Sequence, residues 1–285
     1  MCPRILETKA MVVDGHAHAA GEFFAAADIV RLLDDEGVDK AVLAPGPINE
    51  PKKYPVPNIA RLQGKRRLGF AGNKFLGLLA KRVNREVDYG RANAQVAGMA
   101  RSYPDRIVPA YWVDPFDRET AAGLGTKLEN GGFKALKVHQ CFHRVASDGP
   151  EMDALARFAA EKGLPIFIHL YSKKDAVALV RTISAHPETT FVVAHLLGLD
   201  VFIDAGRPVL GNTYFDTSPP NMVPLWHVRR VLEYFGPEHV LLGSDTPYGK
   251  NNLRSALARV RGLGLPEADE RLVLGENARR IYRLT

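Results

Sequence analysis

The chain has little of the features that mark several special classes of protein. It holds only two cysteines in 285 residues, Cys2 and Cys141, which excludes a disulfide framework. No apolar run approaches the roughly 20 residues that span a bilayer, and the first residues contain no apolar core of the signal-peptide kind. No repeat of fixed period and no low-complexity tract occurs. We therefore expect a globular, cytoplasmic protein without a membrane partner.

Acidic residues are absent from one stretch of the chain. Residues 51–85 carry ten basic side chains and no acidic one, although the whole chain has a net charge of only +6. The excess of positive charge is thus concentrated in one segment. A lid over a site for an anionic substrate, a solvated face and a contact in a homo-oligomer all fit this composition. Nucleic-acid binding is a weaker alternative, because few aromatic residues stand among the basic ones to stack on bases.

Short apolar runs alternate with helical patterns along the chain. Hydrophobic residues make up 46% of the sequence, as in ordinary globular proteins. Strands are expected at residues 11–14, 40–44, 107–113, 133–138, 165–170, 191–196, 213–216 and 240–243. Helices are expected at residues 22–36, 85–102, 118–129, 151–162, 173–186, 200–205, 224–235, 251–263 and 267–282.

Eight strand–helix units predict parallel strands joined by helical crossovers. The near-continuous apolar strands fit a sheet whose outer face is covered by helices. We therefore expect one α/β domain over residues 1–285, folded as a single (β/α)8 TIM barrel with a long basic loop after the second strand. An open doubly wound sheet is the alternative architecture.

Side chains that bind metals follow several of the expected strands. They are His16 and His18 after the first strand, His139 after the fourth, His169 after the fifth, His195 after the sixth and Asp245 after the eighth. The carboxyl ends of barrel strands converge on one face, and that face carries the chemistry in barrel enzymes. We therefore expect these side chains to lie close together.

The spacing of the first two histidines has a physical reason. His16 and His18 are two residues apart on a strand, so both can face inward and hold one ion. With His169 and Asp245 they form a shell of nitrogen and oxygen ligands, which suits one zinc ion, with manganese or iron as alternatives. An open coordination position would hold a water molecule, whose pKa falls to about 7 on zinc.

These motifs resemble the amidohydrolase superfamily, in the amidohydrolase-related branch that contains metal-dependent hydrolases and decarboxylases. The resemblance runs from Val13 to Leu284. The segments that carry it are residues 14–18, 132–139, 168–169, 194–198, 243–247 and 275–278. It implies a barrel enzyme with a divalent metal, and it leaves the substrate open.

The resemblance also implies a role for each residue. The metal ligands would be His16, His18, His169 and Asp245. Asp245 would in addition accept the proton of the activated water, and His195 would orient that water or polarise the substrate.

Two further residues of the fourth expected strand are candidates. Lys137 and His139 share one face, because they are two residues apart. In binuclear relatives a carbamylated lysine or a glutamate on this strand bridges two metals. Lys137 is therefore either such a bridge or a charged partner in the barrel mouth. The candidate substrate contacts are Lys137, His139, Arg144, Tyr171 and Tyr248, with Cys141 as an inert neighbour.

The favoured function is hydrolysis, in which metal-activated water attacks an ester, lactone or amide carbonyl of a small substrate. That substrate is anionic if the basic segment covers the site. Non-oxidative decarboxylation of an aromatic or unsaturated acid is the alternative, although the run from Leu196 to Asp200 departs from the glycine-rich run common in such decarboxylases. A non-enzymatic binding protein on a barrel fold is the alternative of another class.

Overall fold

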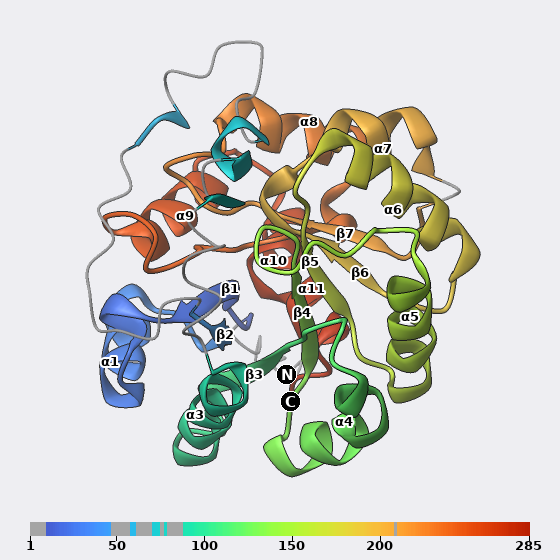
Figure 1. Cartoon of the computed structure of the whole chain (residues 1–285). Helices are drawn as coiled ribbons and strands as arrows, with labels where there is room; N and C mark the ends of the chain where they lie inside the picture. Colours follow the sequence, from blue (N-terminus) through green and yellow to red (C-terminus); the bar gives the residue numbers. More distant parts are fainter. Residues whose placement is uncertain (1–9, 47–57, 61–69, 75–76, 79–87, 208–209) are drawn as a thin grey trace, which may run out of the picture.

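Eight parallel strands form a barrel, and helices surround them (Figure 1). The computed structural model describes residues 10–46, 58–60, 70–74, 77–78, 88–207 and 210–285. The strands are β1 (Val13–Ala19), β2 (Lys40–Pro45), β3 (Ile107–Trp112), β4 (Ala135–His139), β5 (Ile166–His169), β6 (Phe191–Val193), β7 (Thr213–Asp216) and β8 (Val240–Leu241). They pair in sequence order, and a bridge between Ala17 and Thr246 joins β1 to the segment after β8. The predicted (β/α)8 TIM barrel is confirmed.

The helices fill the intervals between the strands. They are α1 (Ala26–Glu36), α3 (Tyr89–Ser102), α4 (Arg118–Gly131), α5 (Pro150–Lys162), α6 (Lys173–Ala185), α7 (Leu199–Ala205), α8 (Leu225–Phe235), α9 (Asn252–Arg261), α10 (Glu267–Arg271) and α11 (Asn277–Ile281). Gly37 ends α1 and Gly163 ends α5, each in the left-handed conformation that glycine adopts without steric cost. At the other end of a helix, Ser172 caps α6 by accepting a hydrogen bond from the backbone N–H of Asp175.

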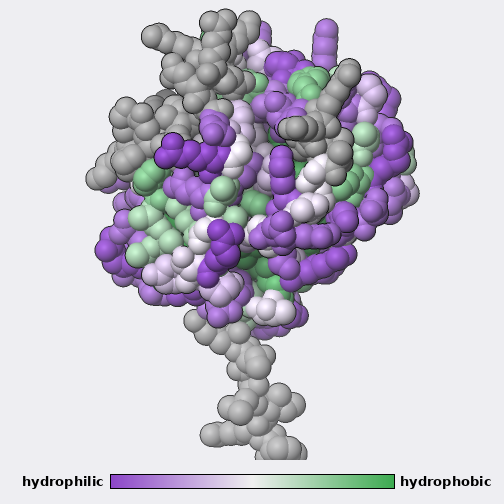
Figure 2. Space-filling view, turned by 60° about the horizontal axis from the view of Figure 1, so that its bottom comes forward, coloured by the Kyte–Doolittle hydropathy of each residue, from purple (hydrophilic) through white to green (hydrophobic). Residues whose placement is uncertain are grey.

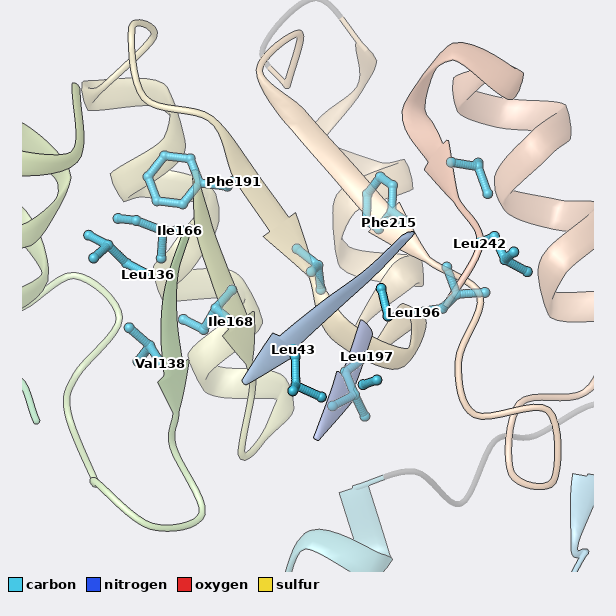
Figure 3. Close-up of a cluster of buried hydrophobic side chains, with 14 of the residues drawn as sticks. Leu43, Leu136, Val138, Ile166, Ile168, Phe191, Leu196, Leu197, Phe215 and Leu242 are labelled. Atoms are coloured by element: carbon cyan, nitrogen blue, oxygen red, sulfur yellow. The ribbon is translucent and has the colours of Figure 1, made fainter. Parts of the chain in front are cut away.

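Alternation along each strand separates two hydrophobic cores. On β4, Leu136 and Val138 belong to the core between the strands and the helices, and Figure 3 shows them beside Ile166 and Ile168 of β5. The residues at the alternate positions of β4 point into the barrel, where Ala135 belongs to a second, smaller hydrophobic core. The same alternation turns Lys137 and His139 inward.

Three carboxyl strand ends differ from the prediction by two residues or more, and all three bear on the site. β1 continues to Ala19 because its backbone is paired on both sides, with Ala44 of β2 opposite His18 and with Thr246 accepting from the His18 N–H at 2.8 Å. The two histidines therefore lie inside the strand. β6 and β8 end early, at Val193 and Leu241.

The expected C-terminal helix over residues 267–282 is divided into α10, a π-helical turn (Leu272–Glu276) and α11. The Val273 carbonyl accepts a hydrogen bond from Leu242 N–H at 2.8 Å, so it is diverted from the helix toward the strand β8. Gly275 lies in this turn, where the backbone of Met11 approaches so closely that no side chain fits. The helix is broken where it docks on the barrel.

This close approach predicts a large loss of stability for Gly275→Ala. The new methyl group would meet the Met11 carbonyl oxygen well inside contact distance, and backbone must move to relieve it. We expect the free energy of unfolding to fall by about 3 kcal/mol. Chemical denaturation measures it. Gly211→Ala is the matched control, because nothing lies within 4 Å of its methyl group. Equal stability of the two variants would contradict the proposed docking.

The predicted basic loop lies mostly outside the described residues. Of residues 51–85 the structure describes only 58–60, 70–74 and 77–78. These pieces contact loops at the carboxyl ends of the strands: Ile59 N–H donates to the Asn221 carbonyl at 2.8 Å, and Asn73 donates to the Leu170 carbonyl at 2.7 Å.

Hydrophilic residues predominate on the face seen in Figure 2, with smaller hydrophobic areas between them. Large exposed hydrophobic side chains of the described residues are few, and only Leu225 and Tyr234 share an element, the helix α8; the others are Leu78, Phe116 and Val177. Within the described ranges, every helix is too short or too polar to cross a bilayer.

Candidate active site

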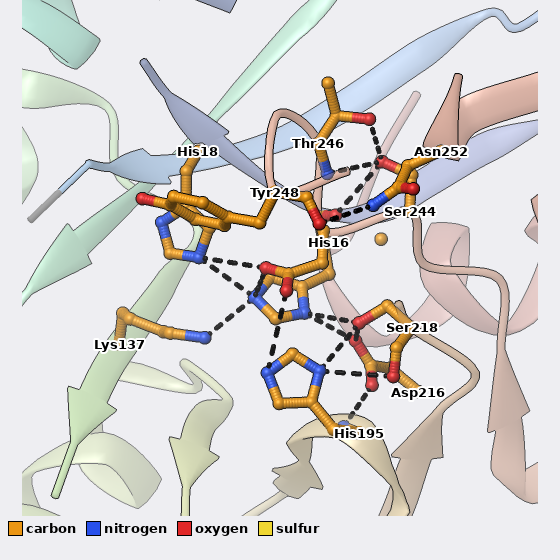
Figure 4. A network of polar contacts seen from close by, with 12 residues as sticks. His16, His18, Lys137, His195, Asp216, Ser218, Ser244, Thr246, Tyr248 and Asn252 are labelled. Atoms are coloured by element: carbon orange, nitrogen blue, oxygen red, sulfur yellow. Dashed lines mark hydrogen bonds and ion pairs between the residues drawn. The ribbon is translucent and has the colours of Figure 1, made fainter. Parts of the chain in front are cut away.

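Buried polar side chains meet at the carboxyl ends of β1, β4, β6, β7 and β8 (Figure 4). His16 and His18 bring their Nε2 atoms to 3.2 Å from each other. The Asp245 Oδ1 atom lies 3.5 Å from both nitrogens. All three side chains are buried. The structure thus gathers three of the four predicted metal ligands.

Hydrogen bonds fix the protonation of the two β1 histidines. His18 Nδ1 lies 2.9 Å from the carbonyl oxygen of Pro45, which can only accept, so Nδ1 carries the hydrogen and Nε2 carries the lone pair. His16 Nε2 lies 2.9 Å from the ammonium of Lys137, which can only donate, so this Nε2 also carries a lone pair. Burial lowers the pKa of both rings, that of His18 to about 3, which keeps them neutral.

His195 approaches the same point from the other side. It lies just beyond β6 in a short 3₁₀ turn, with a φ of 60°. Its Nδ1 lies 3.1 Å from the Ser218 carbonyl oxygen, so Nδ1 carries the hydrogen here too. The Nε2 lone pair faces Asp245 Oδ2 at 3.9 Å. Ligand atoms of His16, His195 and Asp245 all lie within 4.8 Å of one another.

Asp216, at the end of β7, connects these two sides of the site. Its carboxylate lies 2.5 Å from His16 Nδ1 and accepts hydrogen bonds from the Ser218 hydroxyl at 2.6 Å and the His195 backbone N–H at 2.5 Å. Such an outer carboxylate sets the orientation of a ligand ring and makes its other nitrogen a better donor to metal. Sequence reasoning missed Asp216, although it ends its strand at the same face as the other site residues.

A second buried carboxylate holds Asp245 in place. Asp14 accepts from the Ser244 N–H at 2.9 Å and from the Ser244 hydroxyl at 2.5 Å. This fixes the turn in which Asp245 adopts a φ of 54°. Burial raises the pKa of Asp14 to about 7, and it raises that of Asp245 well above its usual value, while the nearby Lys137 opposes the second shift.

Lys137 is fully buried, with its ammonium 4.1 Å above the ring of Phe167. Burial lowers its pKa to about 8, against the attraction of Asp245 and Asp216. Its Nζ atom lies on the His16 side of the cluster, 2.9 Å from His16 Nε2.

His169 lies beside this cluster, next to the ring of His195. Its ring is 4.8 Å from that of His195, edge to face, and stacks on His139 at 4.0 Å, because the two residues are paired in the β4–β5 register. Its Nε2 lies 3.0 Å from Asn73 Oδ1. The ligand atoms of His169 group with those of His139 and Cys141, within 4.8 Å of one another. The structure therefore places the predicted fourth ligand beside the cluster of the other three.

The predicted substrate contacts surround this cluster at different distances. The Tyr248 ring lies 5.3 Å from that of His18. The guanidinium of Arg144 covers the Tyr171 ring at 3.7 Å and lies 3.7 Å from the carboxylate of Asp175, further out. Trp112, which sequence reasoning did not single out, stacks on His139 at 5.4 Å. Burial raises the pKa of Cys141 to about 12, which fits an inert thiol.

Asp216→Asn is expected to disturb the site and the fold together. The amide nitrogen of the new asparagine would face at least one of the three buried groups that donate to Asp216. Two hydrogen-bond donors would then face each other where a hydrogen bond now forms. We expect a loss of about 1–3 kcal/mol in the free energy of unfolding and a fall of about 10–100-fold in metal affinity. Denaturation and chelator competition measure the two effects. Asp153→Asn is the control, since Asp153 holds His186 at 2.8 Å outside the site. An Asp216→Asn variant that behaves like this control would contradict the bridging role.

A family model described as amidohydrolase matches residues 13–284. The chain therefore belongs to the amidohydrolase family and is an enzyme of that family. A sequence search of curated proteins finds no match.

Three solved structures with the same fold are similar to this chain. A 5-carboxyvanillate decarboxylase from Sphingomonas paucimobilis has a TM-score of 0.64 at 16% identity, over 97% of this chain and 100% of that one. A protein from Acinetobacter baumannii assigned as a 2-pyrone-4,6-dicarboxylic acid hydrolase has 0.66 at 13%, over 95% and 99%. A dihydroxybenzoic acid decarboxylase from Polaromonas, with bound manganese, has 0.66 at 13%, over 96% and 97%.

Proposed function

We propose that this chain is a metal-dependent hydrolase that acts on an ester, lactone or amide bond of a small substrate. His16, His18 and Asp245 would hold one divalent ion, zinc in the first place, with His169 as the fourth ligand. One observation carries the proposal. Two unprotonated nitrogens lie 3.2 Å apart with a carboxylate oxygen 3.5 Å from each, and such a set of nitrogen and oxygen donors suits a divalent cation.

When bound, the ion would act as a Lewis acid that activates water and polarises the substrate carbonyl. The residues of the chain supply the proton transfers. Asp245 would accept the proton of the attacking water and pass it to the leaving group, since its carboxylate lies 3.5 Å from both β1 histidines and 3.9 Å from His195. His195 presents the Nε2 lone pair toward the same point, so it would orient the water by accepting a hydrogen bond.

Decarboxylation of an aromatic acid is the second candidate. The same ligands would hold the ion, and two of the similar structures are decarboxylases of aromatic acids. Aromatic rings also border the site, since those of Trp112 and Tyr248 lie 6.2 Å and 5.3 Å from the His18 ring. A planar acid would pack against such rings.

Product analysis separates the two reactions. The protein, loaded with zinc or with manganese, would be offered a panel of esters, lactones, amides and aromatic carboxylic acids in isotopically labelled water. Incorporation of labelled oxygen into a product acid supports hydrolysis. Release of carbon dioxide without that incorporation overturns hydrolysis in favour of decarboxylation. Turnover that persists after complete removal of the ion would overturn both.

A further inference from the structure

Asn73 reaches the site from the connection between β2 and α3. It lies in the described segment 70–74, the residue is 5% exposed, and it contacts the residues that follow β5. Its Nδ2 lies 2.7 Å from the Leu170 carbonyl oxygen and 3.2 Å from that of Tyr171. Its Oδ1 lies 3.0 Å from His169 Nε2.

The two carbonyl groups determine how the amide is oriented. A carbonyl oxygen only accepts hydrogen bonds, so the Asn73 atom facing Leu170 and Tyr171 has to be the amide nitrogen. The atom facing His169 is then the amide oxygen, which also only accepts. His169 Nε2 has to carry the hydrogen in this contact, and in the neutral ring the lone pair lies on Nδ1.

This arrangement is the reverse of that in the three histidines nearest Asp245. His16, His18 and His195 each carry the hydrogen on Nδ1, held by Asp216, Pro45 and Ser218 respectively. Their lone pairs are on Nε2. His169 is held at Nε2 by a side chain from a segment that contributes no strand to the barrel. The tautomer of His169 therefore depends on the docking of residues 70–74.

We propose that Asn73 is a positioning residue that fixes His169 as the tautomer protonated on Nε2, which leaves Nδ1 as the nitrogen that would bind the metal. The consequence for the metal rests on the proposed function. The consequence for the tautomer does not, because it follows from hydrogen bonds within the chain. A ligand histidine whose other nitrogen donates to a fixed acceptor binds metal more tightly, and loss of that acceptor costs about 10–100-fold in affinity.

A purely structural role for Asn73 predicts something different. Asn277 illustrates such a role, because its buried amide donates to the carbonyl groups of Pro237 at 2.7 Å and Val240 at 2.8 Å, at the other end of the barrel strands. Asn277 has no histidine on its oxygen, which faces Arg280. Asn277→Ala is thus the matched control: it removes two amide-to-carbonyl hydrogen bonds and leaves the site intact.

The test is nitrogen NMR of the histidine rings in the metal-free, full-length protein. Wild-type His169 is expected to show the proton on Nε2, opposite to His16, His18 and His195. In Asn73→Ala the His169 signals should move toward a mixture of both tautomers, and zinc affinity, measured by chelator competition, should fall about 10–100-fold. Asn277→Ala should show the wild-type tautomer and affinity.

Each other outcome decides a different claim. If His169 of the wild type carries the proton on Nδ1, the inference is overturned. This measurement does not depend on the folding of any variant. An Asn73→Ala protein with unchanged tautomer and affinity overturns it as well. The expected tautomers without any metal binding to the wild type would leave the positioning role standing and overturn the proposed function.

Discussion

Asp245→Asn is expected to lower turnover by a factor on the order of 10²–10⁴, with the fold retained. The Asp245 carboxylate lies between the two β1 histidines and His195, at 3.5 Å and 3.9 Å from their Nε2 atoms. Asparagine keeps the shape of the side chain, but its amide cannot take up a proton from water and carries no charge for an ion. Both proposed roles of the residue are lost at once.

Steady-state kinetics on the substrate found in the product screen measures this loss. Asp153→Asn is again the control, because it removes a carboxylate that also holds a histidine, His186, outside the site. That variant should turn over like the wild type. Full activity of Asp245→Asn would show that the proton is accepted elsewhere.

The second large effect concerns the stability that a bound ion confers. An ion that binds only the folded chain adds about 2.7 kcal/mol to the free energy of unfolding at 100 times its dissociation constant. We expect zinc to stabilise the wild type by this order, and His16→Ala to lose the effect. His16 contributes one of the two nitrogens at the centre of the donor set.

Thermal and chemical unfolding with and without zinc measure the difference. His186→Ala is the matched control, since His186 is also buried and pairs with Asp153 away from the cluster. It should lower stability and still respond to zinc. An equal response of His16→Ala and wild type would place the ion at another site.

The barrel could be predicted from the sequence because its signal is local. Apolar runs of strand length, each followed by a helical pattern, indicate the order of elements. Lys137 and His139 lie on the same, inner face of β4 because they are two residues apart on a strand. The strand ends were predicted less well. β1 extends to Ala19 because β2 and the segment around Thr246 pair with it, and these partners are distant in sequence.

Two of the site residues that the sequence did not indicate act through another residue. Asp216 holds His16 from 200 positions away, and Asn73 holds His169 from 96 positions away. Neither has a local pattern that separates it from an ordinary aspartate or asparagine. Their roles depend on which loops meet over the barrel, and this is set by the tertiary fold.

Metal content tests the central claim most directly. Untagged protein, purified without chelator and analysed by elemental mass spectrometry, is expected to contain about one zinc, manganese or iron ion per chain. Protein with no ion, even after incubation with each of these metals, would contradict the account, because the donor set of His16, His18 and Asp245 would then exist without the cation that it fits.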